Sequence, residues 1–225
     1  NNYLVALGPT STSCGVAWAD ISTGDFWVEE VSFAHLPSVL SRLCASEILL
    51  PENFEKKYPV QMDDFFGQQT LRPDDEFLIV NQMDIVSKYP AFSKAEQIAI
   101  GVLVNYLKET QLKGMPQLSA PQQFTENKCM SIDGATRRSL ELTSTLSDEK
   151  GAKSLLSTID RTMTGAGARL LASYLSSPLV QSDEINARLD KINYFVDNAL
   201  ITQEVRQILK EIADVERSFS RLASN

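Results

Sequence analysis

Four carboxylate residues near the start of the chain are the side chains best suited to chemistry. Asp20, Asp25, Glu29 and Glu30 lie on or beside two segments expected to form strands. Nucleases that use two metal ions gather such carboxylates around ions roughly 3.5–4 Å apart, which activate water. Asp20 and Asp25 flank a turn, however, and Glu29 and Glu30 are adjacent, hence on opposite faces of a strand. A metal-dependent nuclease is therefore an alternative that the spacing does not favour.

Other catalytic motifs are absent or incomplete. A phosphate-binding P-loop ends in Gly-Lys-Ser/Thr, and none of the 10 glycines is followed by lysine. Gly165-Ala166-Gly167 begins a dinucleotide-type pattern, but its third position is Leu170. His35 is the single histidine, so a Cys–His nucleophile pair is less favoured than a surface histidine at a helix start. We predict no catalytic, cofactor-binding or metal-binding residue, and therefore no enzyme in this chain.

Composition indicates an ordinary globular protein. The 225 residues are 43% hydrophobic and 22% charged, enough chain for two modest domains. No apolar run approaches the roughly 20 residues that cross a bilayer. Three widely separated cysteines suit a reducing cytoplasm better than a disulfide framework, so we expect a cytoplasmic protein without a membrane partner. The absence of an initiator Met and the helical pattern at the end predict an internal fragment.

Charge is divided unevenly along the sequence. Residues 1–112 carry 7 Lys and Arg against 15 Asp and Glu, a net charge of −8. Residues 113–225 carry 14 of each, a net charge of 0. Neither half is the basic surface that contact with nucleic-acid phosphates requires. The acidic half is therefore expected to face a protein partner.

The first half alternates strand and helix patterns. Segments 3–7, 16–21, 26–31 and 47–50 read as strands, the second and third joined by a Gly-containing turn. Residues 36–44 and 95–107 have the apolar spacing of helices. Polar residues 63–75, with Gly67 and Pro73, are predicted to form an exposed loop. This order of elements predicts an α/β layer fold.

The second half has helical patterns only. Gly114, Pro116 and Pro121 indicate a linker, and Asp133 is placed to cap a helix. Ser182, Thr202 and Asp214 are candidate caps of three further helices. The apolar stripes of those helices are interpreted as core faces, listed in order: Ile185, Leu189, Ile192 and Val196; Val205, Ile208 and Leu209; Val215, Phe219 and Leu222.

Several motifs in this half together resemble the MutS family of DNA mismatch-repair proteins. Residues 132–142, IDGATRRSLEL, resemble the core-domain signature Asp-x-Ala-Thr-Arg-x-x-Leu-Glu-Leu. Residues 155–171 and the ending YLSSPL at 174–179 resemble the next signature, with Tyr174 in place of Trp. Ile185, Arg188 and Asp190 match the following helix, and Asp214-Val215-Glu216-Arg217 matches an Asp-hydrophobic-Glu-Arg segment. Residues 16–26 resemble a strand pair of the MutS connector domain.

The resemblance implies a domain plan. Residues 1–112 would form a ribonuclease H-like connector without its catalytic set, 113–124 a linker, and 125–225 the first part of an all-α core (lever) domain. Phe124-Thr125-Glu126 superficially repeats the Phe-x-Glu wedge of these proteins, but it lies in the predicted linker. A generic helical scaffold is a further alternative, which leaves the joint pattern unexplained.

The resemblance also implies roles for the parent protein. That protein would bind mismatched duplex DNA as a homodimer and hydrolyse ATP with Mg²⁺ in other domains, making it a DNA-dependent ATPase. This chain would couple those sites and contribute to docking a MutL-like protein. The acidic loop 63–75, which includes Phe65 and Phe66, is our candidate for that docking.

Overall fold

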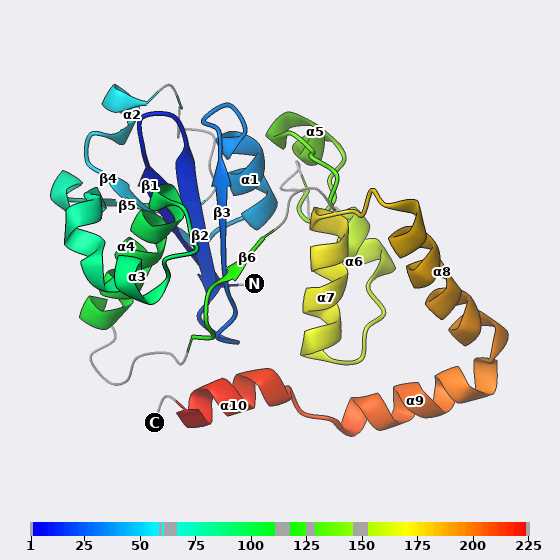
Figure 1. Ribbon diagram of the computed structural model, residues 1–225. Helices are drawn as coiled ribbons and strands as arrows, with labels where there is room; N and C mark the ends of the chain where they lie inside the picture. The colour runs from blue at the N-terminus through cyan, green and yellow to red at the C-terminus, as the bar shows by residue number, and fades with distance from the viewer. Residues whose placement is uncertain are drawn as a thin grey trace. The chain divides into compact units, whose positions relative to one another are not determined.

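The structure is a computed structural model that describes residues 2–58, 60, 67–110, 118–124, 129–145 and 153–223. The chain divides into two compact units (Figure 1). One comprises Asn1–Thr125 with Phe219–Asn225, and the other comprises Glu126–Ser218. The first contains a sheet with helices and the second contains helices, so the predicted α/β domain followed by an all-α region is confirmed.

The described strands of the first unit form one mixed sheet in the order β5-β4-β1-β2-β3-β6. β1, β2 and β3 form an antiparallel meander, while β4 and β5 extend it from β1 as parallel strands, and β6 pairs parallel with β3. The strands are β1 (Tyr3–Pro9), β2 (Cys14–Asp20), β3 (Phe26–Val31), β4 (Glu47–Pro51), β5 (Gln68–Arg72) and β6 (Gln122–Gln123).

Helices cover both faces of this sheet because successive strand residues point to opposite sides. Val5 and Leu7 pack with α1 and α2, whereas Leu4 and Ala6 pack with α3 and α4. Val16 and Trp18 likewise face the first layer and Ala17 and Ala19 the second, as their alternation predicts. The helices are α1 (Leu36–Leu43), α2 (Phe54–Lys57), α3 (Met83–Lys88) and α4 (Lys94–Thr110), with 3₁₀ turns at Asp74–Phe77 and Ile79–Gln82.

Two glycines let α4 lie directly on the sheet. Gly8 and Gly15 are cross-strand partners in β1 and β2. A Cβ built on Gly15 would lie 2.1 Å from the carbonyl oxygen of Ala95, and one on Gly8 would lie 2.2 Å from the same atom. These contacts are with backbone, which cannot rotate away as a side chain can. Glycine at both positions therefore sets how closely the first turn of α4 approaches.

The predicted loop and linker need correction where the structure describes them. Residues 68–72 of the expected loop form β5, held by parallel pairing with β4, and a 3₁₀ turn follows at Asp74–Phe77. Residues 61–66, including Phe65 and Phe66, lie outside the described residues. Within the expected linker, residues 113–117 also lie outside them, but β6 pairs with β3. Residues 118–124 thus belong to the sheet unit rather than to a free connection.

The second unit consists, where described, of short and medium helices with polar caps. Asp133 caps α5 as predicted, its carboxylate accepting a hydrogen bond from the Thr136 amide at 2.9 Å. Ser154 and Thr164 cap α6 and α7 in the same way. The helices are α5 (Gly134–Ser139), α6 (Leu155–Ile159), α7 (Gly165–Ser176), α8 (Ser182–Asp197) and α9 (Ala199–Glu211), followed by α10 (Val215–Ala223).

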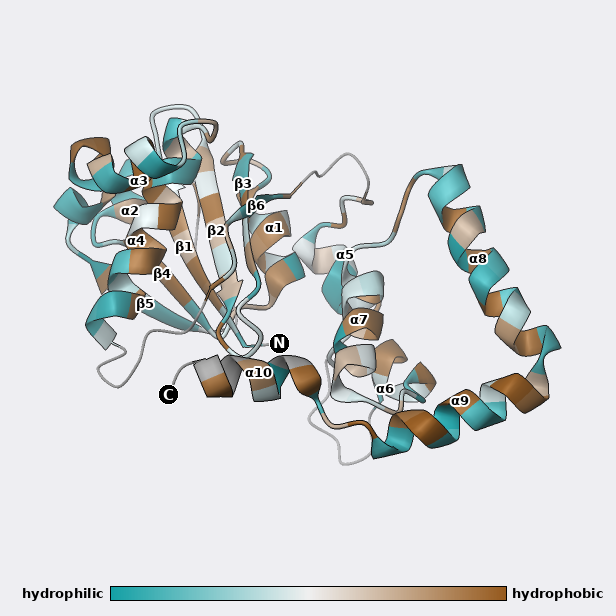
Figure 2. Cartoon of the chain, turned by 60° about the horizontal axis from the view of Figure 1, so that its bottom comes forward, coloured by the Kyte–Doolittle hydropathy of each residue, from teal (hydrophilic) through white to brown (hydrophobic). Residues whose placement is uncertain are grey.

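Two predicted caps and the predicted core stripes of this unit are not observed. Ser182 is the first residue of α8, after Gln181 at the cap position, and Thr202 lies inside α9. Most apolar residues predicted to be core are exposed, for example Ile192 (51%) and Val196 (70%), whereas Ile185 and Leu209 are half-buried. Figure 2 shows hydrophobic bands along α8 and α9. No described part of the chain packs over these apolar faces closely enough to bury them.

Candidate functional site

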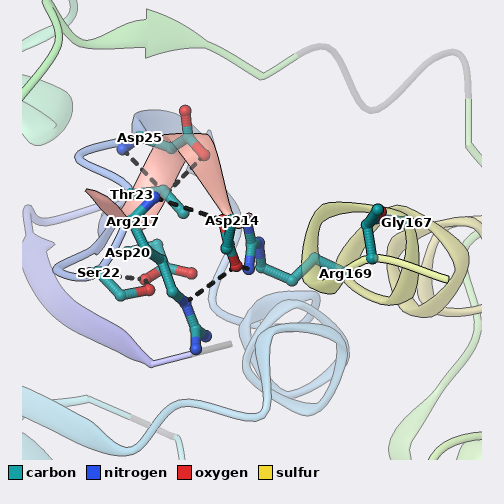
Figure 3. Close-up of polar contacts among 9 residues, drawn as sticks. Asp20, Ser22, Thr23, Asp25, Gly167, Arg169, Asp214 and Arg217 are labelled. Atoms are coloured by element: carbon teal, nitrogen blue, oxygen red, sulfur yellow. Dashed lines mark hydrogen bonds and ion pairs between the residues drawn. The ribbon is translucent and has the colours of Figure 1, made fainter. Parts of the chain in front are cut away.

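The two aspartates proposed for metal chemistry build a turn between β2 and β3. Asp20 is buried, and its carboxylate accepts hydrogen bonds from the Ser22 amide at 2.9 Å and the Ser22 hydroxyl at 2.5 Å. Thr23 donates its hydroxyl proton to Asp25 at 2.8 Å (Figure 3). Gly24 supplies the positive φ, +84°, that the turn requires. Both carboxylates are thus engaged in local structure.

The two glutamates take separate partners. Glu29 is buried and forms an ion pair with Arg42 of α1, whereas Glu30 is exposed and accepts a hydrogen bond from the Ser13 hydroxyl. Within the described ranges, no group of three or more His, Cys, Asp or Glu side chains could hold a metal ion. A two-metal nuclease needs its carboxylates gathered around the same pair of ions. The four candidate carboxylates point to separate partners and do not form such a group.

Arg42 also joins an aromatic cluster with Trp18 and Phe124. Its guanidinium carbon lies 4.1 Å from the Phe124 ring centroid and 5.5 Å from that of Trp18. The two rings meet edge to face at 5.6 Å, and the Phe124 amide donates to the Val28 carbonyl at 2.8 Å. Phe124 therefore packs inside the sheet unit, which is no setting for a base-stacking wedge. Thr125 and Glu126 lie outside the described residues.

The cysteines and the histidine do not form a nucleophilic pair in the described structure. Burial raises the pKa of the Cys14 thiol to about 12, which keeps it protonated near neutral pH. His35 precedes α1 on the surface, where its Nδ1 lies 3.1 Å from the Ser32 hydroxyl. Cys44 is exposed at the other end of α1 and has a left-handed φ of +46°. The surface interpretation of His35 agrees with this geometry.

The most specific polar contact of the helical unit joins Arg169 and Asp214. Arg169 Nη1 lies 2.7 Å from Asp214 Oδ2, and Nη2 lies 3.0 Å from Oδ1 (Figure 3). The hydrogen bonds from Arg169 lower the pKa of Asp214 to about 2, so its carboxylate is charged near neutral pH. Sequence reasoning singled out both residues, as parts of separate motifs, and missed their contact because 45 positions separate them.

The exposed large hydrophobic residues of the sheet unit, where described before residue 125, fall on one short stretch. They are Leu71, Leu78, Val80 and Met83, with exposed fractions of 52–66%. Asp74, Asp75 and Glu76 lie within the same stretch. An apolar group bordered by acidic residues is typical of a protein-binding surface. Among the described residues, no helix is long and apolar enough to cross a membrane.

Comparison with known proteins gives matches over the whole length. The family model MutS domain II matches residues 2–122, and MutS domain III matches residues 135–225. Proteins named DNA mismatch repair protein MutS from Ruegeria pomeroyi, Wolbachia pipientis wMel and a Bradyrhizobium species are 37%, 36% and 36% identical, each over 99% of this chain. The chain covers 26–27% of those proteins, so it spans about a quarter of the length of these relatives.

Proposed function

The chain belongs to the MutS family, and from this premise we propose that it couples the mismatch-binding and ATPase parts of a DNA mismatch-repair protein. Its sheet unit is the connector and its helical unit the first part of the core. In the parent protein, a homodimer, other domains contact the mismatched duplex and hydrolyse ATP with Mg²⁺. This chain itself transmits conformational change between the mismatch-binding domain and the ATPase domain.

The observation that carries the proposal is the brevity of the connection between the two domains. Phe124 is held in the sheet unit, and Cys129 pairs by a β-bridge with Leu179 in the helical unit. Four residues of sequence lie between Phe124 and Cys129. Because an extended chain spans at most about 3.6 Å per residue, so short a connection passes on a displacement that a long linker would absorb.

A flexible insertion in the full-length protein tests this coupling. A short Gly-Ser segment placed between Thr125 and Glu126 should abolish most of the mismatch-dependent change in ATP turnover. Basal turnover and mismatch affinity should remain. The matched control places the same segment between Ser11 and Thr12, which are exposed in the turn after β1. Full mismatch-dependent turnover with the insertion at residue 125 would refute the proposal.

Docking of a MutL-like protein is assigned to the stretch from Leu71 to Met83. The exposed apolar side chains would supply the contact. Asp74 and Glu76 form ion pairs with Lys57 and Arg72, so steering of a basic partner at low salt falls mainly to Asp75. The net charge of −8 over residues 1–112 supports a protein partner rather than DNA. This assignment moves the docking candidate from loop 63–75 to the described residues 71–83, which overlap the end of that loop.

Site-specific crosslinking tests the docking surface. In a full-length background with Cys44→Ser and Cys129→Ser, cysteines at Val80 and Met83 should trap MutL only when ATP and a mismatch are present. The control is Ala34→Cys, exposed just before α1, which covers the other face of the sheet. Equal trapping at Ala34, or none at Val80 and Met83, would remove this assignment and leave the coupling proposal standing.

A further inference from the structure

The beginning of α10 is attached to the helical unit by polar contacts rather than by a core. Helices α6 to α9 contain no buried residue. By contrast, the side chains of Arg169 and Asp214 are 14% and 23% exposed. The ion pair is therefore better shielded from water than the apolar stripes of α8 and α9.

The contact has the geometry of a fixed joint rather than of a loose surface ion pair. Two parallel N–H···O bonds, of 2.7 and 3.0 Å, hold the planar guanidinium against the carboxylate. Such a two-bond arrangement restricts orientation as well as distance. Arg217 approaches the same carboxylate more loosely, its Nε 3.8 Å from Asp214 Oδ2, and its side chain is 45% exposed. Arg169 is thus the restricting partner.

Asp214 serves two helices at once. Its backbone carbonyl accepts the Ser218 amide at 3.0 Å, and its carboxylate lies 3.4 Å from the Arg217 amide, so it caps α10. The same carboxylate binds Arg169 in the second turn of α7. The first turn of α10 cannot move away from α7 unless the ion pair breaks.

A glycine makes room for this arrangement. A Cβ on Gly165, the first residue of α7, would lie 2.6 Å from Asp214 Oδ2. A contact that short is not tolerated, so alanine at this position would push the carboxylate away. The partial positive charge at the start of α10 also stabilises the charged Asp214 carboxylate. Steric fit, charge and capping therefore all converge on one position of Asp214.

We propose that the Arg169–Asp214 ion pair is a positioning clasp that holds the first turn of α10 against α7. Only Ile212, Ala213 and Asp214 separate α9 from α10, so the clasp lies at the connection between these two helices. Resting on the proposed coupling role, the clasp makes this connection a stiff joint that carries movement onward into α10. Arg169 and Asp214 act by positioning and have no part in chemistry.

Distance measurement between spin labels tests the clasp directly. In the full-length protein, with exposed cysteines replaced, labels are placed at Leu170 of α7 and Val215 of α10, which are 52% and 65% exposed. Asp214→Asn is the informative variant because asparagine still caps a helix but cannot form the ion pair. It should broaden the distance distribution clearly, as should Arg169→Gln. Arg169→Lys, which keeps the charge without the two-bond fork, should broaden it less.

The matched control is Arg217→Gln, which removes the looser and more exposed partner. It should leave the distribution at wild-type width, and far-ultraviolet circular dichroism should show equal helix content in all variants. Gly165→Ala, which leaves both charges in place, should broaden the distribution by steric displacement alone. Wild-type width in Asp214→Asn, or equal broadening in Arg217→Gln, would overturn the proposal.

Turnover measurements separate failure of the clasp from failure of the coupling role. Asp214→Asn should reduce the ratio of mismatch-stimulated to basal ATP turnover roughly threefold to tenfold, with basal turnover unchanged. If the wild-type protein shows no such stimulation, the coupling role fails, and the spin-label distances still decide whether the clasp exists. If the distances broaden while the ratio stays at its wild-type value, the clasp does not serve coupling, and that part is overturned.

Discussion

Substitution of Gly15 by alanine tests how α4 is seated on the sheet. The added Cβ would lie 2.1 Å from the Ala95 carbonyl oxygen, 2.3 Å from its carbonyl carbon and 2.7 Å from the Glu96 amide nitrogen. Relief to an ordinary contact of about 3.4 Å requires α4 to move by about 1 Å. That shift disturbs a helix whose Ala99, Ile100 and Leu103 are fully buried.

The sign of the effect is diagnostic. Without the close approach, alanine in place of a strand glycine would stabilise the protein by roughly 0.5–1 kcal/mol. Overfilling a packed interior costs about 1–3 kcal/mol, and more where backbone must move, so we expect a loss of about 3 kcal/mol. Out of a total of about 5–15 kcal/mol for a typical protein, such a loss is easily measured.

Urea unfolding followed by tryptophan fluorescence provides the assay. The chain has 2 tryptophans, Trp18 and Trp27, which are cross-strand partners in the sheet unit. With a slope of about 2 kcal/mol per M urea, the midpoint should fall by about 1.5 M. Gly134→Ala, at the start of α5 in the other unit, should leave it unchanged. Gly8→Ala combined with Gly15→Ala should be less than additive, because α4 is displaced once. A raised or unaltered midpoint for Gly15→Ala would refute the reasoning.

Three further outcomes are expected. Arg42→Ala should reduce the free energy of unfolding by about 3–5 kcal/mol because it removes a charged partner of the buried Glu29 carboxylate. In urea titration, the double variant Arg42→Met with Glu29→Leu should recover most of that loss, and equal losses would contradict this. Thr164→Ala should lower the free energy of unfolding by about 1 kcal/mol because α7 loses its cap, whereas Thr164→Ser should keep the cap and the stability. Thermal unfolding followed by circular dichroism measures the difference. The folded pKa of Asp214, about 2, lies below its unfolded value of about 3.9, so the clasp should be intact above pH 4 and weaken as pH falls toward 2, with Asp214→Asn insensitive in that window.

The sequence predicts the elements whose pattern comes from burial. β3 (Phe26–Val31) has its predicted bounds, and α1 and α4 agree to within a few residues, because apolar side chains recur at the period of each element. β5 was missed because it is the edge strand beside β4, with Gln68, Gln69 and Leu71 exposed, so its side chains carry no alternating apolar signal. β6 was missed because two residues paired only through backbone leave no mark on side-chain type.

Contacts between residues far apart in the chain likewise could not be predicted from the sequence. Asp214 was identified as a cap, but nothing local indicates that its carboxylate binds Arg169. The expected cap Thr202 lies inside α9 and donates its hydroxyl proton to the Phe195 carbonyl of α8 at 2.6 Å. Ser, Thr and Asp compete for several local hydrogen bonds, so residue type alone does not decide which one forms.

The two edges of the sheet differ in how they resist adding a strand from another molecule. β5 ends one edge with a short strand of polar and basic residues, Gln68, Gln69 and Arg72, which discourages pairing with a second chain. The other edge is β6, which in the described part of the chain pairs just two residues with β3, a strand rich in Phe, Trp and Val. Phe124, packed on Trp18 and Arg42, holds that cover in place. A variant that frees Phe124 would therefore show itself first as precipitation at high concentration, since it uncovers a β-prone strand at an open edge.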